Sequence, residues 1–231
     1  SMRGVRPVSC LIRSASFNLS GMIRGRLGDL DGAVKDFTTS LAIADSMKVN
    51  GLREVNHTNW AYVMQVKGHW REALDHYRAV RELAISAGAG KDELAECETG
   101  IGYMLVRLDS LDQAAAILER LRSTKAMVGH PYEQEFNNAW ALLQLRRGRY
   151  REAAVSAHTA FVTEQGDEND VIKRDASRIL SDAYKALGQP GEALKWTEVA
   201  HQWEDSVLYR QQANDAVRQE MERQMATRAE Q

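Results

Sequence analysis

One short phrase recurs five times along this chain of 231 residues, and no other feature limits its possible folds so strongly. The copies are GDLDGAV from position 28, GHWREAL from 68, DSLDQAA from 109, GRYREAA from 148 and GQPGEAL from 188. Successive copies begin 40, 41, 39 and 40 residues apart. Repetition at a fixed period of this size is typical of proteins in which one structural unit stacks on the next.

Each copy predicts a helix that ends and another that begins. It opens on a turn residue (Gly28, Gly68, Asp109, Gly148, Gly188), and an alanine always follows five positions later (Ala33, Ala73, Ala114, Ala153, Ala193). Glycine adopts the left-handed conformation that terminates helices, and aspartate is one of its few substitutes. A second set of breaks is expected at Gly51, residues 88–90, Gly129 and Gly166. The sequence therefore predicts a helix–turn–helix unit repeated five times, without strands.

A small residue stands seven positions before every turn. These residues are Gly21, Ala61, Gly102, Ala141 and Ser181. Glycine within a helix costs about 1 kcal/mol relative to alanine, so it usually marks a close approach of two helices. We therefore expect the two helices of each unit to pack tightly at this position.

The small residue, the turn residue seven later, the bulky residue two after that and the alanine three further on together resemble the tetratricopeptide repeat. The resemblance covers residues 10–205, with a period longer than the usual 34 residues. It implies a right-handed α-solenoid of five repeats, an all-α fold, that recognises a protein or peptide in its concave groove. We expect residues 1–205 to form the solenoid and residues 206–231 to form a capping or connector helix continuous with the last repeat.

The tail extends the resemblance to bacterial signalling proteins. The phrase EDSVL at 204–208, followed by a charged helix, is similar to the join between tetratricopeptide sensors and their output domains. The commonest such output is the GGDEF diguanylate cyclase, which implies a regulatory sensor region and possible homodimerisation through the last helix. Two alternatives remain open: a free-standing adaptor or scaffold, and the ligand-binding region of a transcription regulator.

No pattern of catalytic or metal-binding residues is visible. HExxH, GxSxG and phosphate-loop motifs are absent, and Cys10 and Cys97 are isolated in the sequence. We expect no enzyme activity, cofactor or metal within these residues, and two buried or half-buried thiols. The net charge of −2 argues against nucleic acid as a partner, and no apolar run is long enough to span a membrane. These features favour a cytoplasmic protein.

Stacked repeats bind ligands along the concave face, which the first helix of each unit lines. Counting from the small residue, we expect the groove to contain Asn18, Met22, Arg26, Thr58, Asn59, Tyr62, Gln65, Thr99, Tyr103, Arg107, Asn138, Leu142, Arg146, Arg178, Asp182 and Lys185. Arg26, Arg107 and Arg146 occupy the same place in three units. Such a row could hold the carboxylates of a peptide, or it could simply complement the negative ends of the helices.

Overall fold

The computed structural model describes residues 5–90, 94–125, 127–129, 131–163 and 170–229, and all regular structure in these ranges is α-helical. The expected all-α class is confirmed. The helices are α1 (Val5–Arg26), α2 (Leu30–Met47), α3 (Asn50–Val66), α4 (Trp70–Ser86), α5 (Ala95–Arg107), α6 (Leu111–Ser123), α7 (Glu133–Arg146), α8 (Tyr150–Val162), α9 (Asp170–Ala186) and α10 (Pro190–Ala229).

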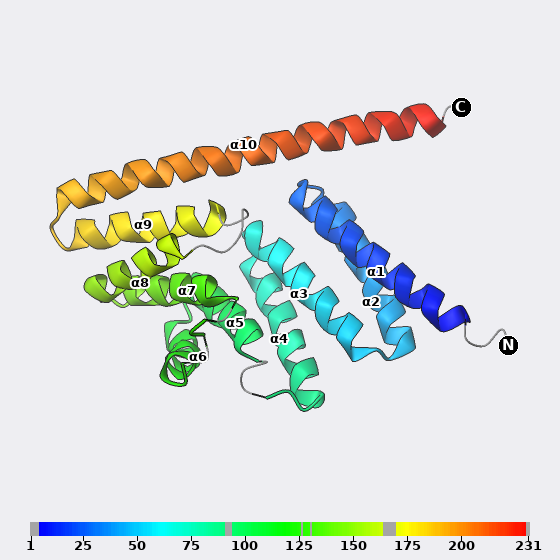
Figure 1. Cartoon of the computed structure of the whole chain (residues 1–231), viewed down its shortest axis with the longest axis horizontal. Coiled ribbons are helices and arrows are strands. Elements are labelled where there is room, and N and C mark those ends of the chain that lie inside the picture. Colours follow the sequence, from blue (N-terminus) through cyan, green and yellow to red (C-terminus); the bar gives the residue numbers. More distant parts are fainter. Residues whose placement is uncertain (1–4, 91–93, 126, 130, 164–169, 230–231) are drawn as a thin grey trace.

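The helices pack as pairs in chain order: α1 with α2, α3 with α4, α5 with α6, α7 with α8, and α9 with α10 (Figure 1). Each pair contacts the next through its second helix. The repeated phrase therefore marks the turn inside each pair, as the sequence predicts.

All five predicted turn residues adopt the left-handed conformation. Their φ angles are 87° at Gly28, 81° at Gly68, 62° at Asp109, 74° at Gly148 and 70° at Gly188. The aspartate in the third copy therefore takes the backbone conformation that glycine takes in the other four.

The predicted breaks between pairs are only partly correct. Gly88 and Gly129 have positive φ, but Gly51 lies inside the first turn of α3 and terminates nothing. The left-handed residue there is Lys48, which caps α2 with its N–H on the carbonyls of Ala44 and Asp45. Gly166 lies outside the described residues.

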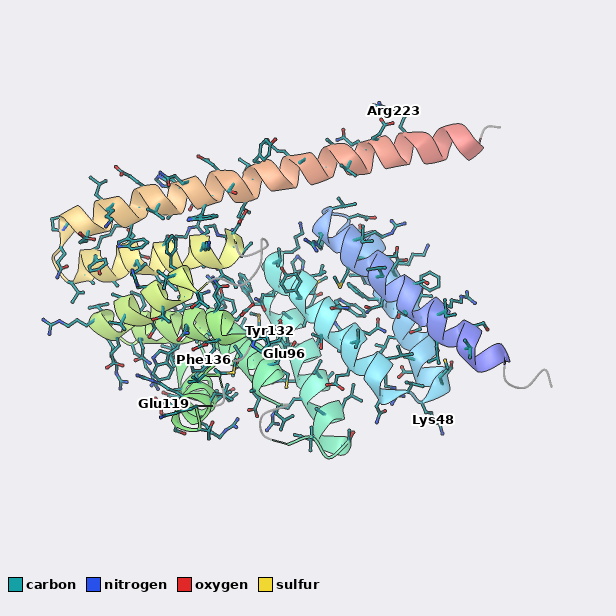
Figure 2. All side chains as sticks on the ribbon, viewed as in Figure 1. Lys48, Glu96, Glu119, Tyr132, Phe136 and Arg223 are labelled. Atoms are coloured by element: carbon teal, nitrogen blue, oxygen red, sulfur yellow. The ribbon has the colours of Figure 1, made fainter. Side chains whose placement is uncertain are left out.

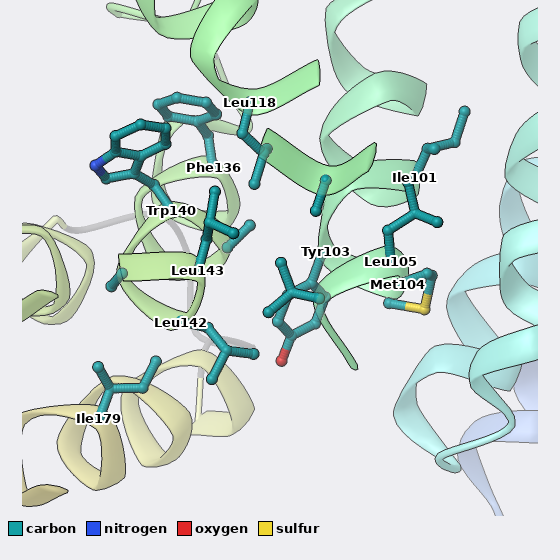
Figure 3. Packing of buried hydrophobic residues seen from close by; sticks show 14 of the residues in the cluster. Ile101, Tyr103, Met104, Leu105, Leu118, Phe136, Trp140, Leu142, Leu143 and Ile179 are labelled. Atoms are coloured by element: carbon teal, nitrogen blue, oxygen red, sulfur yellow. The ribbon is translucent and has the colours of Figure 1, made fainter. Parts of the chain in front are cut away.

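The small residues allow the helices of a pair to approach closely, as predicted. A Cβ atom added to Gly21 would lie 2.9 Å from the ring of Phe37, and one added to Gly102 would lie 2.6 Å from Leu118. Ala61 and Ala141 are fully buried. Figure 3 shows the core between the middle pairs, where Leu118 faces Phe136 and Leu143.

Helix α10 is one continuous helix of 40 residues. Its first part packs along α9, where Arg178 pairs with Glu204 and the Ser206 hydroxyl donates to Asp170 at 2.9 Å. Further along, the carboxylate of Asp215 would lie 3.4 Å from a Cβ on Gly28. Helix α10 therefore reaches from the last pair to the turn of the first (Figure 1). No helix in the described part of the chain has both the length and the apolar character that a membrane span needs.

Candidate functional site

The first helices of the pairs line one side of the molecule, and α3 and α5 separate there. Helix α1 contacts α3, α5 contacts α7 and α7 contacts α9, whereas the described residues of α3 and α5 have little direct contact. Tyr77 of α4 occupies the space between them. Its ring packs on Gly100 of α5, and its hydroxyl donates to Gln65 of α3 at 2.9 Å.

A pocket of about 320 Å³ opens at this separation. Its lining comes mainly from the first helices: Thr58, Asn59, Tyr62, Gln65 and Val66 of α3; Tyr77 of α4; Glu96, Thr99, Gly100 and Tyr103 of α5; Tyr132, Glu135 and Asn138 at α7; and Val171, Ile172 and Asp175 of α9. A pocket of this size is large enough for a small molecule or one peptide side chain.

About half of the predicted groove residues line this pocket. They are Thr58, Asn59, Tyr62, Gln65, Thr99, Tyr103 and Asn138. The others lie outside its lining: Asn18, Met22, Arg26, Leu142, Arg107, Arg146, Arg178, Asp182 and Lys185. A ligand-binding role for any of these residues stays a prediction.

Several of the residues outside the lining have internal partners. Asn18 is buried, donates to Asn56 at 2.9 Å and accepts from Asn59 at 2.6 Å, which joins α1 to α3. Asp182 lies 3.4 Å from Lys185 on the surface of α9. These contacts are part of the scaffold rather than of the pocket.

Two of the three arginines expected to hold ligand carboxylates are engaged by carboxylates of the chain itself. Arg107 donates to Asp175 at 2.7 Å and to the Tyr103 hydroxyl, and Arg146 donates to Asp109 at 2.7 Å. Each is the last residue of its helix, where a cation is favoured by the helix dipole. For Arg107 and Arg146, the structure therefore favours the alternative of helix-end complementation.

The acidic lining was missed by the sequence analysis, although the chain carries a signal for it. Glu96, Glu135 and Asp175 each stand six positions before the small residue of their repeat, one helical turn before the groove position that we considered. Three consecutive repeats thus carry a carboxylate at the same place. Figure 2 shows Glu96 and Tyr132 near each other in the middle of the molecule.

The three carboxylates have different surroundings. Asp175 is buried and accepts from Tyr103 at 2.9 Å, from Arg107 and from Arg174, so its charge is neutralised. Glu96 accepts a hydrogen bond from Tyr132, whose pKa is raised by burial and by this contact. No described lysine or arginine forms an ion pair with Glu96 or Glu135.

Burial raises the pKa of the Glu135 carboxyl, and the neighbouring charge of Glu96 raises it further. A carboxylate in the first turn of a helix ordinarily has a lowered pKa, because the helix dipole favours its charge. At Glu135, burial has a larger effect on the pKa than the hydrogen bond from its own backbone N–H, which lowers it. The charged form of the Glu135 carboxyl, beside the pocket, is therefore disfavoured by its burial.

Metal-binding and thiol side chains also occur outside the pocket. In the described ranges, no three His, Cys, Asp or Glu side chains gather where they could hold a metal ion. Cys97 is buried and Cys10 is half-buried, as predicted, and burial raises the pKa of the Cys97 thiol to about 12. A thiol with such a pKa remains protonated and unreactive at neutral pH.

No protein-family model matches the chain, and no curated protein matches it in sequence. Among solved structures, the chain is similar to the crystal structure of BtubC (BKLC) from P. vanneervenii. The TM-score is 0.63 at 15% sequence identity, over 87% of this chain and 83% of that chain. A likeness at this identity concerns the fold alone, and it extends over most of both helical proteins.

Proposed function

We propose that this chain is a non-catalytic recognition module built as a right-handed α-solenoid of five long tetratricopeptide-like repeats. The left-handed turns at a constant period, the close helix contacts at the small positions and the fold shared with BtubC support this proposal. Its ligand binds in the pocket between α3 and α5.

The observation that carries the proposal is a buried polar residue in the pocket lining with an unsatisfied acceptor. Asn138 is only 3% exposed, and its Oδ1 atom has no hydrogen-bond partner among the described residues. A buried acceptor without a partner costs about 1–3 kcal/mol. This cost in stability is offset when a bound ligand supplies the missing hydrogen bond.

A wider role follows from the resemblance and from α10. We infer that the module is the regulatory sensor region of a bacterial cytoplasmic signalling protein with a GGDEF diguanylate cyclase output. Helix α10 lies on α9 and also reaches the turn at Gly28, so a ligand that moves α3 relative to α5 would alter both supports of this helix. A homodimer through α10 would then transmit the change. A free-standing adaptor and a transcription regulator remain the alternatives.

A pocket-filling variant tests the recognition proposal. Thr58 lines the pocket, so Thr58→Trp places a large ring inside it, whereas Val155→Trp puts the same ring on the exposed surface of α8, away from the lining. A ligand-observed NMR screen of cationic, anionic and neutral fragments should give hits that Thr58→Trp abolishes and Val155→Trp retains. Fragments that bind both variants as well as the unsubstituted protein, or a screen without any hits, would refute the proposed pocket.

The coding sequence beyond Gln231 tests the wider role separately. A GGDEF domain in the same reading frame is the expected finding. A stop codon would favour the adaptor, and a DNA-binding domain on either side would favour the transcription regulator. Neither of these findings would affect the pocket itself.

A further inference from the structure

The described lining of the pocket is negatively charged. Among the residues that the structure describes, it includes Glu96, Glu135 and Asp175 but neither lysine nor arginine. Asp175 is neutralised by Arg107 and Arg174. Glu96 and Glu135 have no such partner among the described residues, so the pocket retains uncompensated negative charge. Both carboxylates are half-buried, and the pocket therefore presents their charge to a ligand.

Two acceptor atoms in the same place lack donors. Oδ1 of Asn138 and Oε2 of Glu135 are both buried and have no hydrogen-bond partner in the described structure. They lie three residues apart on α7 and therefore share one face of that helix. A single donor-rich group in the pocket could satisfy both, and the need of Asn138 for a donor adds to the acidic charge of Glu135.

Four tyrosines contribute to the remaining walls. The rings of Tyr62, Tyr77, Tyr103 and Tyr132 line the pocket. The hydroxyls of Tyr77 and Tyr103 are directed to Gln65 and Asp175. Aromatic faces attract cations that lie within about 6 Å of the ring centre. The chain already uses this contact, because the Arg107 guanidinium lies 5.0 Å from the ring centre of Tyr103.

We infer that the pocket binds an organic cation with several N–H donors, an alkylguanidinium or alkylammonium group, through Glu96, Glu135, Asn138 and the tyrosine rings. This inference rests on the proposed function and names the ligand class of the same pocket. It reverses the polarity expected from the arginine row, which implied a ligand carboxylate. Either the basic side chain of a peptide or a small free cation can supply the group.

Matched probes that differ only in charge test this assignment by titration calorimetry. The peptide acetyl-Gly-Arg-Gly-amide carries a guanidinium, and its citrulline counterpart carries a neutral group of nearly the same shape. Butylguanidinium represents a free cation. We expect the arginine peptide to bind at least about tenfold more tightly than the citrulline peptide, because charge-assisted hydrogen bonds are the stronger ones.

Charge-neutral variants of the pocket complete the test. Glu135→Gln and Glu96→Gln should each weaken the arginine peptide about tenfold, whereas Glu152→Gln, the same charge change at an exposed site of α8, should leave its affinity within about twofold. If butylguanidinium binds as tightly as the arginine peptide, the natural ligand is a small free cation. If the arginine peptide binds much more tightly than butylguanidinium, the ligand is the basic side chain of a peptide.

Two outcomes would overturn the cation assignment. One is that the arginine and citrulline peptides bind equally tightly and that Thr58→Trp abolishes the binding of both. This result would support the pocket as a binding site but would contradict its preference for a cation. The other is no binding of any cationic probe at roughly 10 mM, a concentration at which even a millimolar complex is largely formed. In that case, neutral or anionic fragment hits that Thr58→Trp abolishes would still support the proposed function.

Discussion

At the scale of single residues, backbone conformation and side-chain volume explain why the repeated phrase is spaced as it is. Asp109 and the four turn glycines all have positive φ, which ends one helix and starts the next. Seven residues earlier, a small side chain lets the partner helix approach. Both demands recur in every pair, so the sequence shows them at a constant period.

Gly102 provides the sharpest test of the small position. A Cβ at this residue would lie 2.6 Å from Leu118, so Gly102→Ala should destabilise the protein by about 1–2 kcal/mol after the gain in helix propensity. Gly51, also in a helix, has nothing within 4 Å of its added Cβ, so Gly51→Ala should be neutral or stabilising. Urea unfolding of both variants measures the difference. Equal effects would mean that no close approach exists at Gly102.

A half-buried histidine pair makes stability depend on pH. Nδ1 of His57 lies 2.8 Å from Nδ1 of His76, whose ring stacks on Trp60 with centroids 4.2 Å apart. Burial lowers the pKa of both imidazoles; for His76 the charge of His57 contributes further, and the pKa falls to about 4.

Because both folded-state pKa values are lowered, stability is fully present above the unfolded pKa of about 6.5 and is lost as pH falls toward 4. In His76→Phe, the free energy of unfolding should vary less steeply over this range, by up to about 1 kcal/mol per pH unit. Urea denaturation at pH 7, 6 and 5 measures this slope. The exposed His201→Gln serves as the control, and an unchanged slope in His76→Phe would rule out the pair as its source.

At the scale of helices, sequence reasoning located the elements well because periodic apolar and small residues control them. It was wrong at Gly51, because the helix break there uses a left-handed lysine, Lys48. No composition rule favours lysine in that conformation, whereas glycine is the usual choice. The helix-ending glycines at the other turns were predictable for the same reason.

Part of the pocket lining was predictable from the repeat, but the pocket itself was not. Thr99, Tyr103 and Asn138 face the pocket because they share a register with the small residue of each repeat. The pocket exists because α3 and α5 separate around Tyr77, and that separation depends on packing between neighbouring pairs. Glu96 and Glu135 lie one helical turn before Thr99 and Asn138. Their place in the pocket lining could be recognised only once the separation of α3 and α5 was known.

Helices α4, α5 and α6 are joined by a buried carboxylate. Glu98 of α5 is 1% exposed and pairs with Arg81 of α4 at 3.1 Å and with Arg120 of α6 at 2.6 Å. The contact with Arg120 is an ion pair without hydrogen-bond geometry. Glu98 is buried, whereas the two arginines are partly exposed. Removing both arginines would therefore leave a buried carboxylate without an ion-pair partner.

The double variant Arg81→Ala/Arg120→Ala should therefore cost about 3 kcal/mol of unfolding free energy. Arg178→Ala breaks the partly exposed pair with Glu204 and should cost less than about 1 kcal/mol. Chemical denaturation compares the two. If the double variant were as mild as the control, Glu98 would not act as the junction of these three helices.

At the scale of the whole molecule, the pocket lies where the second and third pairs diverge, and α10 spans the molecule from the last pair to the first. A ligand that contacts both α3 and α5 would fix the relative position of the two halves. In the proposed function, this ordering of the two halves would connect the chemistry of the pocket to a change in shape at the ends, where an output domain or a second copy would respond.

Hydrogen–deuterium exchange with acetyl-Gly-Arg-Gly-amide tests this account most directly, because it locates the ligand in solution without assuming a site. The account predicts slower exchange in α3, over residues 58–66, and in α5, over 95–103, with little change along the face of α10 that packs on α9. The citrulline peptide provides the charge control. Protection confined to α10 or to α1 and α2, with α3 and α5 unaffected, would contradict the account.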